Sequence, residues 1–295
     1  MWIRRCVLLF ALALPAHADN ISLWHIRTAE ASVYLLGSVH VLRGNDYPLP
    51  AAMIEAYEAS DVIVFEVDLT QMSPEDMSRI MLAEGLYGPG ETLGDEVPAD
   101  LYSRLADYAA DNDMRMDRVA QMRPWLVSLS ISQQELARHR YDPSLGVDQF
   151  FMGRAYRDGK DVRALETYAE QIGFLAGDPP AVQVAALGVA LDGLPAFSED
   201  LAAFKSAWVA GNADLMLSLS LAPLAAEPLL EQQTETLIYK RNQRMAGQIR
   251  EFIREGGNFL VVVGALHMGG PRGLINQLQA DYPVRQISET KEGSP

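Results

Sequence analysis

The chain has 295 residues, and 49% of them are hydrophobic, which is enough to fill the core of one large domain or two small ones. Its formal net charge is -15, which opposes binding to nucleic acid and to anionic membrane surfaces. After the first residues, no stretch offers the roughly 20 uncharged apolar residues that span a bilayer, so we expect no stable membrane insertion. Small molecules, peptides and cations remain as the expected ligands.

The first 18 residues have the pattern of a secretory signal peptide. Arg4 and Arg5 give a basic start, a short apolar run follows, and Pro15-Ala-His-Ala18 ends the segment with small residues. We expect cleavage before Asp19, a soluble mature chain with a net charge of -17 (-15 less the two arginines), and a periplasmic or secreted location. Cys6, the single cysteine, would leave with this segment, which excludes cysteine chemistry in the mature chain.

Strands and helices alternate at the beginning of the chain. The pattern predicts a hairpin of strands over 23–27 and 32–36, a helix over 50–60, and a continuous apolar strand over 62–67. An apolar run that is reached through a helix is typical of a parallel strand covered on both faces.

Residues 74–230 are mainly helical and predict a large helical insertion that packs over the sheet. A short strand over 161–166 interrupts this region, directly after the helix stop Asp158-Gly159. The expected helices of the insertion cover 98–110, 124–138, 147–158 and 181–191.

The alternation of helices and strands returns at the end of the chain. The pattern predicts a long helix over 227–255, a buried strand over 259–263, a helix over 273–280 and a strand over 284–287. We therefore expect one α/β domain over 19–295, with a βαβ-type sheet formed by the N- and C-terminal parts and the helical insertion between them.

Two Gly-x-x-His segments each follow an apolar strand. Gly37-Ser-Val-His40 comes after Val33-Tyr-Leu-Leu36, and Gly264-Ala-Leu-His267 comes after Leu260-Val-Val-Val263, which indicates a possible internal repeat. Glycine lets the backbone turn sharply or approach a ligand closely. In an open α/β sheet, ligands bind beyond the carboxyl ends of the strands, where both histidines are expected. The alternative is that each is a satisfied core histidine.

Two glutamates have equivalent positions near the ends of predicted strands. Glu66 belongs to the run 62–67, and Glu166 follows Val162-Arg-Ala-Leu165. A buried carboxylate needs a partner or a cation. Together with His40 and His267, these residues would suit binding of a divalent cation or general acid-base chemistry. The alternative is that each glutamate caps the following helix or pairs with an arginine.

Arg241 lies on the apolar stripe of the long predicted helix, so its charge needs an inward partner. It could orient Glu66 or Glu166, or bind a substrate carboxylate or oxyanion. The alternative is an aliphatic stem on the core with its charged end in solvent. Asn242 is a secondary candidate beside it. For Asp148, capping of a helix is favoured over a role in the site.

Several established catalytic motifs are absent from the sequence. There is no His-Glu-x-x-His, no Gly-x-Ser-x-Gly and no Gly-x-x-x-x-Gly-Lys, which disfavours serine hydrolases of the usual kind and nucleotide enzymes.

In their order along the chain, six short motifs resemble the TraB/GumN family, which is related to the Tiki proteases. The motifs are Tyr34-Leu-Leu-Gly-Ser-Val-His40, Val64-Phe-Glu66, Gly146-Val-Asp148, Ala164-Leu-Glu-Thr167, Lys240-Arg-Asn-Gln-Arg-Met245 and Val263-Gly-Ala-Leu-His-Met268. The resemblance covers nearly all of the expected mature chain. It implies that paired Gly-x-x-His motifs and a glutamate form a metal-dependent peptidase centre in Tiki-type members, while TraB-type members inactivate secreted peptide signals. More distant relatives of the fold include esterase-like enzymes and a haem-binding protein.

The leading hypothesis is an exported divalent-metal-dependent hydrolase that acts on peptides or other small molecules. His40 and His267 would hold Zn, Mn or Co, Glu66 would be a ligand or the base, Arg241 would stabilise the oxyanion, and Glu166 would belong to the catalytic set. One alternative is a non-catalytic periplasmic protein that binds haem, metal or peptide. Another is a metal-free esterase-like hydrolase with histidine as its base.

Overall fold

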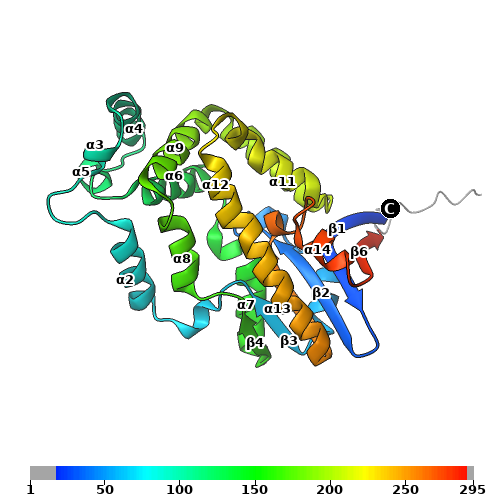
Figure 1. The fold of residues 1–295 in the computed structure, drawn as a ribbon. Helices are drawn as coiled ribbons and strands as arrows, with labels where there is room; N and C mark the ends of the chain where they lie inside the picture. Colours follow the sequence, from blue (N-terminus) through cyan, green and yellow to red (C-terminus); the bar gives the residue numbers. More distant parts are fainter. Residues whose placement is uncertain (1–17, 291–295) are drawn as a thin grey trace, which may run out of the picture.

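The computed structural model describes residues 18–290 and has a mixed α/β fold (Figure 1). The predicted signal peptide lies outside the described residues except for Ala18, which is the first residue of β1. A six-stranded sheet has the order β4-β3-β5-β2-β1-β6. Its strands are β1 (Ala18–Arg27), β2 (Ala31–Ser38), β3 (Val62–Phe65), β4 (Asp161–Ala164), β5 (Gly257–Gly264) and β6 (Val284–Thr290).

The centre of the sheet is parallel and buried. β4, β3, β5 and β2 run parallel to one another, and β1 pairs antiparallel with β2 and β6. Phe259 to Val263 in β5 are all at most 1% exposed. Since successive side chains of a strand point to opposite faces, both faces of the sheet are covered here, as the unbroken apolar run predicts.

The two Gly-x-x-His segments end neighbouring parallel strands, so this part of the fold prediction is confirmed. In the register between β2 and β5, Gly37 pairs with Val263 and Ser38 with Gly264. The two motifs are therefore offset by one residue across the pair, and Gly264 lies beside Ser38 at the carboxyl edge.

The helices of the frame flank the sheet, and most of the others form the insertion (Figure 1). Their bounds are α1 (Ala51–Glu58), α2 (Pro74–Gly85), α3 (Leu93–Glu96), α4 (Ala99–Asp111), α5 (Met116–Val119), α6 (Pro124–Arg138), α7 (Val147–Asp158), α8 (Tyr168–Ala176), α9 (Pro180–Asp192), α10 (Phe197–Val209), α11 (Ala213–Leu221), α12 (Leu230–Thr234), α13 (Arg241–Glu255) and α14 (Leu274–Gln279).

Sequence signals at the helix ends explain several of these bounds. Pro124 occupies the first turn of α6, and Gly159 ends α7 in the left-handed conformation with φ of 67°. The long helix predicted over 227–255 begins later, at Leu230, because a turn at residues 228 and 229 precedes it. A π-helical turn, Glu235–Lys240, joins α12 to α13.

No single helix among the described residues is long and apolar enough to cross a membrane. Within residues 18–290, the bent pair α8 and α9, at an angle of 86°, reaches that length and composition together.

Candidate active site

The four residues predicted at the strand ends come together at the carboxyl edge of the parallel strands. Three of them, His40, Glu66 and His267, line a pocket of about 650 Å³, together with Arg241. Glu166 is not among the lining residues, and its side chain is 0% exposed. The sheet therefore supplies a charged floor to the pocket, with Glu166 beneath it.

Gly264, the glycine of the second motif, lies at the point where these side chains converge. A Cβ atom added there would be 3.1 Å from Glu66 Oε1 and 3.7 Å from both His40 Nε2 and His267 Cδ2. Those two histidine atoms are therefore at most twice 3.7 Å apart. Any larger residue at position 264 would fill the space between the functional groups.

The orientation of His267 is set by Asn242, which is fully buried in α13. Asn242 donates from Nδ2 to the Arg272 carbonyl at 2.9 Å, so its Oδ1 is the acceptor that faces His267 Nδ1 at 2.6 Å. His267 Nδ1 therefore carries the proton, and Nε2 keeps its lone pair. Burial, opposed by the nearby Glu66 carboxylate, lowers the pKa of His267 to about 4, which keeps the ring neutral at pH 7.

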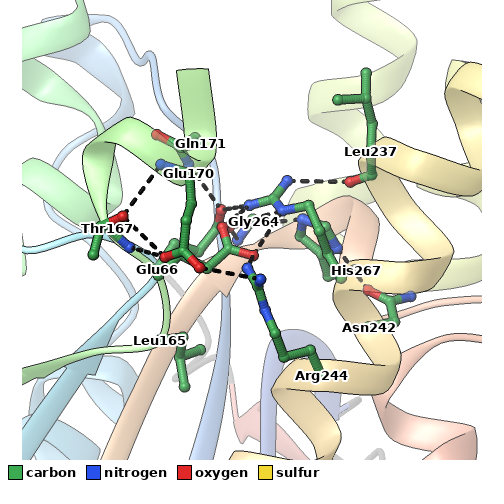
Figure 2. Close-up of polar contacts among 12 residues, drawn as sticks. Glu66, Leu165, Thr167, Glu170, Gln171, Leu237, Asn242, Arg244, Gly264 and His267 are labelled. Carbon is green, nitrogen blue, oxygen red and sulfur yellow. Dashed lines mark hydrogen bonds and ion pairs between the residues drawn. The ribbon is translucent and has the colours of Figure 1, made fainter. Parts of the chain in front are cut away.

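Glu66 follows β3 directly and is held ionised by its surroundings (Figure 2). Its Oε1 accepts the Gly264 N–H at 2.5 Å, and its Oε2 accepts Arg241 Nη2 at 2.5 Å and Gln171 Nε2 at 3.3 Å. Burial alone would raise the pKa of Glu66, but its neighbours lower it to about 2: His267 where it is protonated, in acid, and otherwise Arg241, His40 and the Gly264 N–H.

His40 lies two residues beyond β2 and faces the pocket, where its side chain is 67% exposed. Its Nδ1 is 3.2 Å from Asp148 Oδ1. The contact with Asp148 raises the pKa of His40 to about 9. Gly146 makes this approach possible, since a Cβ there would be 2.5 Å from the His40 carbonyl oxygen. Gly146 is the N-cap of α7, so the capping role expected for Asp148 is wrong.

Arg241 points inward and joins the two glutamates. Its Nη2 donates to Glu66 and to Glu166, its Nε donates to Glu166 at 3.0 Å, and its Nη1 donates to the Leu237 carbonyl at 3.1 Å. Arg244 also donates to Glu166, at 2.6 Å. Glu166 is thus occupied by two guanidinium groups, and the alternative of a solvated Arg241 head does not hold.

Two further polar residues line the pocket that sequence reasoning missed. The Ser38 hydroxyl is buried and has no hydrogen-bond partner among the described residues, and Gln171 donates to Glu66. Ser38 belongs to the first Gly-x-x-His segment, which was the available signal. Gln171 lies in α8, just after Glu166, but nothing in its local sequence indicates an inward direction.

Two atoms that could serve as ligands of a divalent cation, His267 Nε2 and Glu66 Oε1, lie within reach of a single ion. Each ligand atom lies about 2 Å from a bound Zn²⁺, so two ligand atoms of one ion are at most about 4 Å apart. His267 Nε2 and Glu66 Oε1, both lone-pair donors, face one another at 3.9 Å. Within residues 18–290, no group of three or more His, Cys, Asp or Glu side chains has the spacing of a complete site, so His40 would have to come closer to act as a third ligand.

Fold and site together define a mixed α/β protein with a histidine and glutamate pocket at the carboxyl edge of its parallel strands. The chain belongs to the TraB/PrgY/gumN family, whose sequence profile matches residues 22–286. This match confirms the resemblance seen in the motifs.

Metalloprotease TIKI2 of Danio rerio is 28% identical to the chain over 301 aligned residues. The alignment covers 85% of this chain and 57% of that protein, so the chain spans little more than half the length of this relative. No solved structure matches the chain significantly.

Proposed function

We propose that the chain is a divalent-metal-dependent hydrolase that cleaves peptides. The observation that supports this most directly is the facing pair of lone-pair donors, His267 Nε2 and Glu66 Oε1, 3.9 Å apart on the floor of a pocket. Each of these atoms has a lone pair that could bind a cation placed between them. The distant relationship to a metalloprotease agrees with a cation.

The residues of the site have separate roles in this proposal. His267 and Glu66 hold the ion, and His40 completes the set. A bound Zn, Mn or Co ion would supply a water molecule of lowered pKa and would polarise the substrate carbonyl. Asn242 fixes the His267 ring, since ligating histidines usually donate their other N–H to an acceptor.

Arg241 acts mainly on Glu66 in this arrangement. Its Nε and Nη2 are already directed at the two glutamates, so it keeps Glu66 ionised and in place. If Arg241 also binds the oxyanion, it can do so only through the second N–H of Nη1, because its other N–H groups already have partners. Glu166 then serves to hold Arg241, because two arginines occupy its carboxylate.

The contact between His40 and Asp148 supports a second candidate, a metal-free hydrolase. A histidine whose Nδ1 faces a carboxylate and whose Nε2 is open to a pocket has the arrangement of a general base, and its pKa of about 9 predicts that His40 acts as a base only at alkaline pH. In that case His40 would remove the proton from the attacking water and return it to the leaving group.

Peptide cleavage with and without chelator separates the two candidates. The test uses untagged protein, a peptide library and mass spectrometry of the products. We expect cleavage to stop in chelator, to return with Zn, Mn or Co, and to fall at least about 100-fold in Glu66→Gln. Cleavage that persists in chelator but fails in His40→Ala would support the metal-free hydrolase. Metal binding without any cleavage would support the alternative of a non-catalytic binding protein.

A further inference from the structure

We propose that the substrate is an uncharged, apolar peptide segment, with a side chain of leucine or phenylalanine size beside the bond that is cleaved. This inference rests on the proposed function, because it describes what the same pocket accepts. Its basis is the division of the pocket into a charged floor and an apolar wall.

The wall of the pocket is apolar and comes from the helical region. Its members are contributed by α6, α8, α10 and the π-helical turn, and they are Leu129, Leu136, Phe174, Phe204, Leu237 and Ile238. All six are half-buried and line the pocket, and Leu129 and Phe204 also pack against the hydrophobic core. Leu129 and Leu136 are two helical turns apart and therefore share one face of α6.

The charges of the pocket are confined to its floor. The lining residues that can carry charge are His40, Glu66, Asp148, Arg241 and His267. All of them belong to the strand ends or to the first turns of α7 and α13. None of the lining residues of α6, α8 or α10 is charged, so a charged substrate side chain on the wall would lose its hydration without gaining a partner.

The charged floor and the apolar wall of the pocket are separated by no more than the length of one side chain. The Leu237 carbonyl accepts Arg241 Nη1 at 3.1 Å, and the Phe174 ring lies 5.6 Å from Arg241 Cζ. A peptide bond bound at the floor therefore places its neighbouring side chain against the wall. The π-helical turn that carries Leu237 and Ile238 is a rare feature that occurs often at functional sites.

The size of the pocket fits a short segment of chain. Its volume of about 650 Å³ lies in the middle of the range of roughly 300–1,000 Å³ found for ligand sites. The net charge of -15 adds a general repulsion of acidic peptides.

The test compares matched peptides that differ only at the residues flanking the cleaved bond, with leucine, phenylalanine, tryptophan, lysine or glutamate there. For the metal-loaded wild type, we expect kcat/KM for leucine and phenylalanine to exceed that for lysine and glutamate roughly 10-fold or more. Equal cleavage of the charged peptides would overturn the proposal while leaving the hydrolase in place.

Leu136→Ala should increase the cleavage of tryptophan peptides relative to leucine peptides, a change that partial misfolding would not produce. The shortened side chain enlarges the wall, so the ratio of tryptophan to leucine cleavage should rise several-fold, and this ratio does not depend on the fraction of active protein. Leu201→Ala is the matched control, since Leu201 lines a neighbouring pocket and not this one. Equal ratios in Leu136→Ala and wild type would overturn the assignment of the wall.

Measurement of peptide binding distinguishes an error in this inference from an error in the proposed function. If no peptide is cleaved, but labelled leucine peptides bind the wild type and lysine peptides do not, the hydrolase is wrong and the apolar pocket is supported. If neither kind of peptide binds or is cleaved, both are overturned.

Discussion

Glu166 is the most completely paired carboxylate of the site. Its side chain is 0% exposed, and Arg241 and Arg244 both donate to it. Removing one partner of a buried ion pair leaves an uncompensated charge, which costs about 3 kcal/mol or more. We therefore expect Glu166→Gln to lower the free energy of unfolding in urea by about 3 kcal/mol.

Glu170→Gln is the control for this change. Glu170 pairs with Arg244 at 3.4 Å but is 47% exposed, and glutamine can still complete the capping box with Thr167. Its effect on unfolding should stay within about 0.5 kcal/mol. Equal losses in the two variants would contradict the view that burial makes the Glu166 pairing important.

Asn242 determines which nitrogen of His267 faces the pocket. Asn242→Ala removes the acceptor of the Nδ1 proton, so the ring can rotate or change tautomer. We expect metal affinity, measured by titration with Zn²⁺, to fall roughly 10- to 100-fold. Gln243→Ala, an exposed neighbour on the same helix, should bind as the wild type does. Unchanged affinity in Asn242→Ala would exclude His267 as an oriented ligand.

The strand-end residues of the site could be predicted because parallel strands bring their carboxyl ends to one edge. The apolar runs that precede them were enough to predict the positions of His40, Glu66 and His267. The contacts of Asn242 with His267 and Arg272 could not be predicted, since they depend on packing between separate segments of the chain. The same applies to Asp148, where local rules favoured a helix cap and the approach to His40 decided otherwise.

At the scale of elements, the start of α7 holds the loop that carries His40. Val147 donates its N–H to the Val39 carbonyl at 2.9 Å, and Gly146 packs against the His40 backbone. A Cβ atom in Gly146→Ala would meet the His40 carbonyl oxygen at 2.5 Å and push the loop away. We expect a loss of about 1–3 kcal/mol in stability and loss of peptide cleavage.

Gly153→Ala in the same helix is the matched control. Its nearest contact would be the flexible end of Arg157 at 3.5 Å, so alanine should be tolerated and should stabilise the helix by about 0.5–1 kcal/mol. If both alanine variants behave alike in thermal unfolding and cleavage, the close approach of α7 to His40 is not important.

Asp178 links the α8–α9 turn to α12 through a hydrogen bond from Gln233 at 3.1 Å. Burial, opposed by this hydrogen bond, raises the pKa of Asp178 above its usual value of 3.8. The folded state therefore binds its proton more tightly than the unfolded state, so this group costs stability as the pH rises above 3.8. We expect Asp178→Asn to be more stable than wild type in urea at pH 7, with the gap closing toward pH 4. If the difference in stability between Asp178→Asn and wild type grew as the pH fell, the raised pKa of Asp178 would be contradicted.

The helices were predictable where their ends carry local signals. The bounds of α6 and α7 agree with the prediction because Pro124 begins one and Gly159 ends the other. The π-helical turn could not be predicted, since its residues have the same apolar periodicity as an α-helix.

At the scale of the whole molecule, the sheet and the helical region contribute different parts of the pocket. The sheet gathers the charged groups at one edge, and helices that lie between its strands in the sequence contribute the apolar wall. The frame of strands was predictable from apolar runs and turn signals. The wall was not, because half-buried leucines of a helical region look the same in sequence whether they cover a pocket or a neighbouring helix.

We propose that His40, Glu66 and His267 bind one divalent ion together. The most direct test is the metal content of untagged protein, measured by mass spectrometry after equilibration with Zn²⁺, Mn²⁺ or Co²⁺ and removal of the excess. We predict about one ion per chain in wild type and in the control His25→Ala, whose histidine is stacked on Tyr34 away from the pocket. His40→Ala and His267→Ala should each lose the ion. A wild type that holds no ion, or histidine variants that hold as much as the control, would contradict the account.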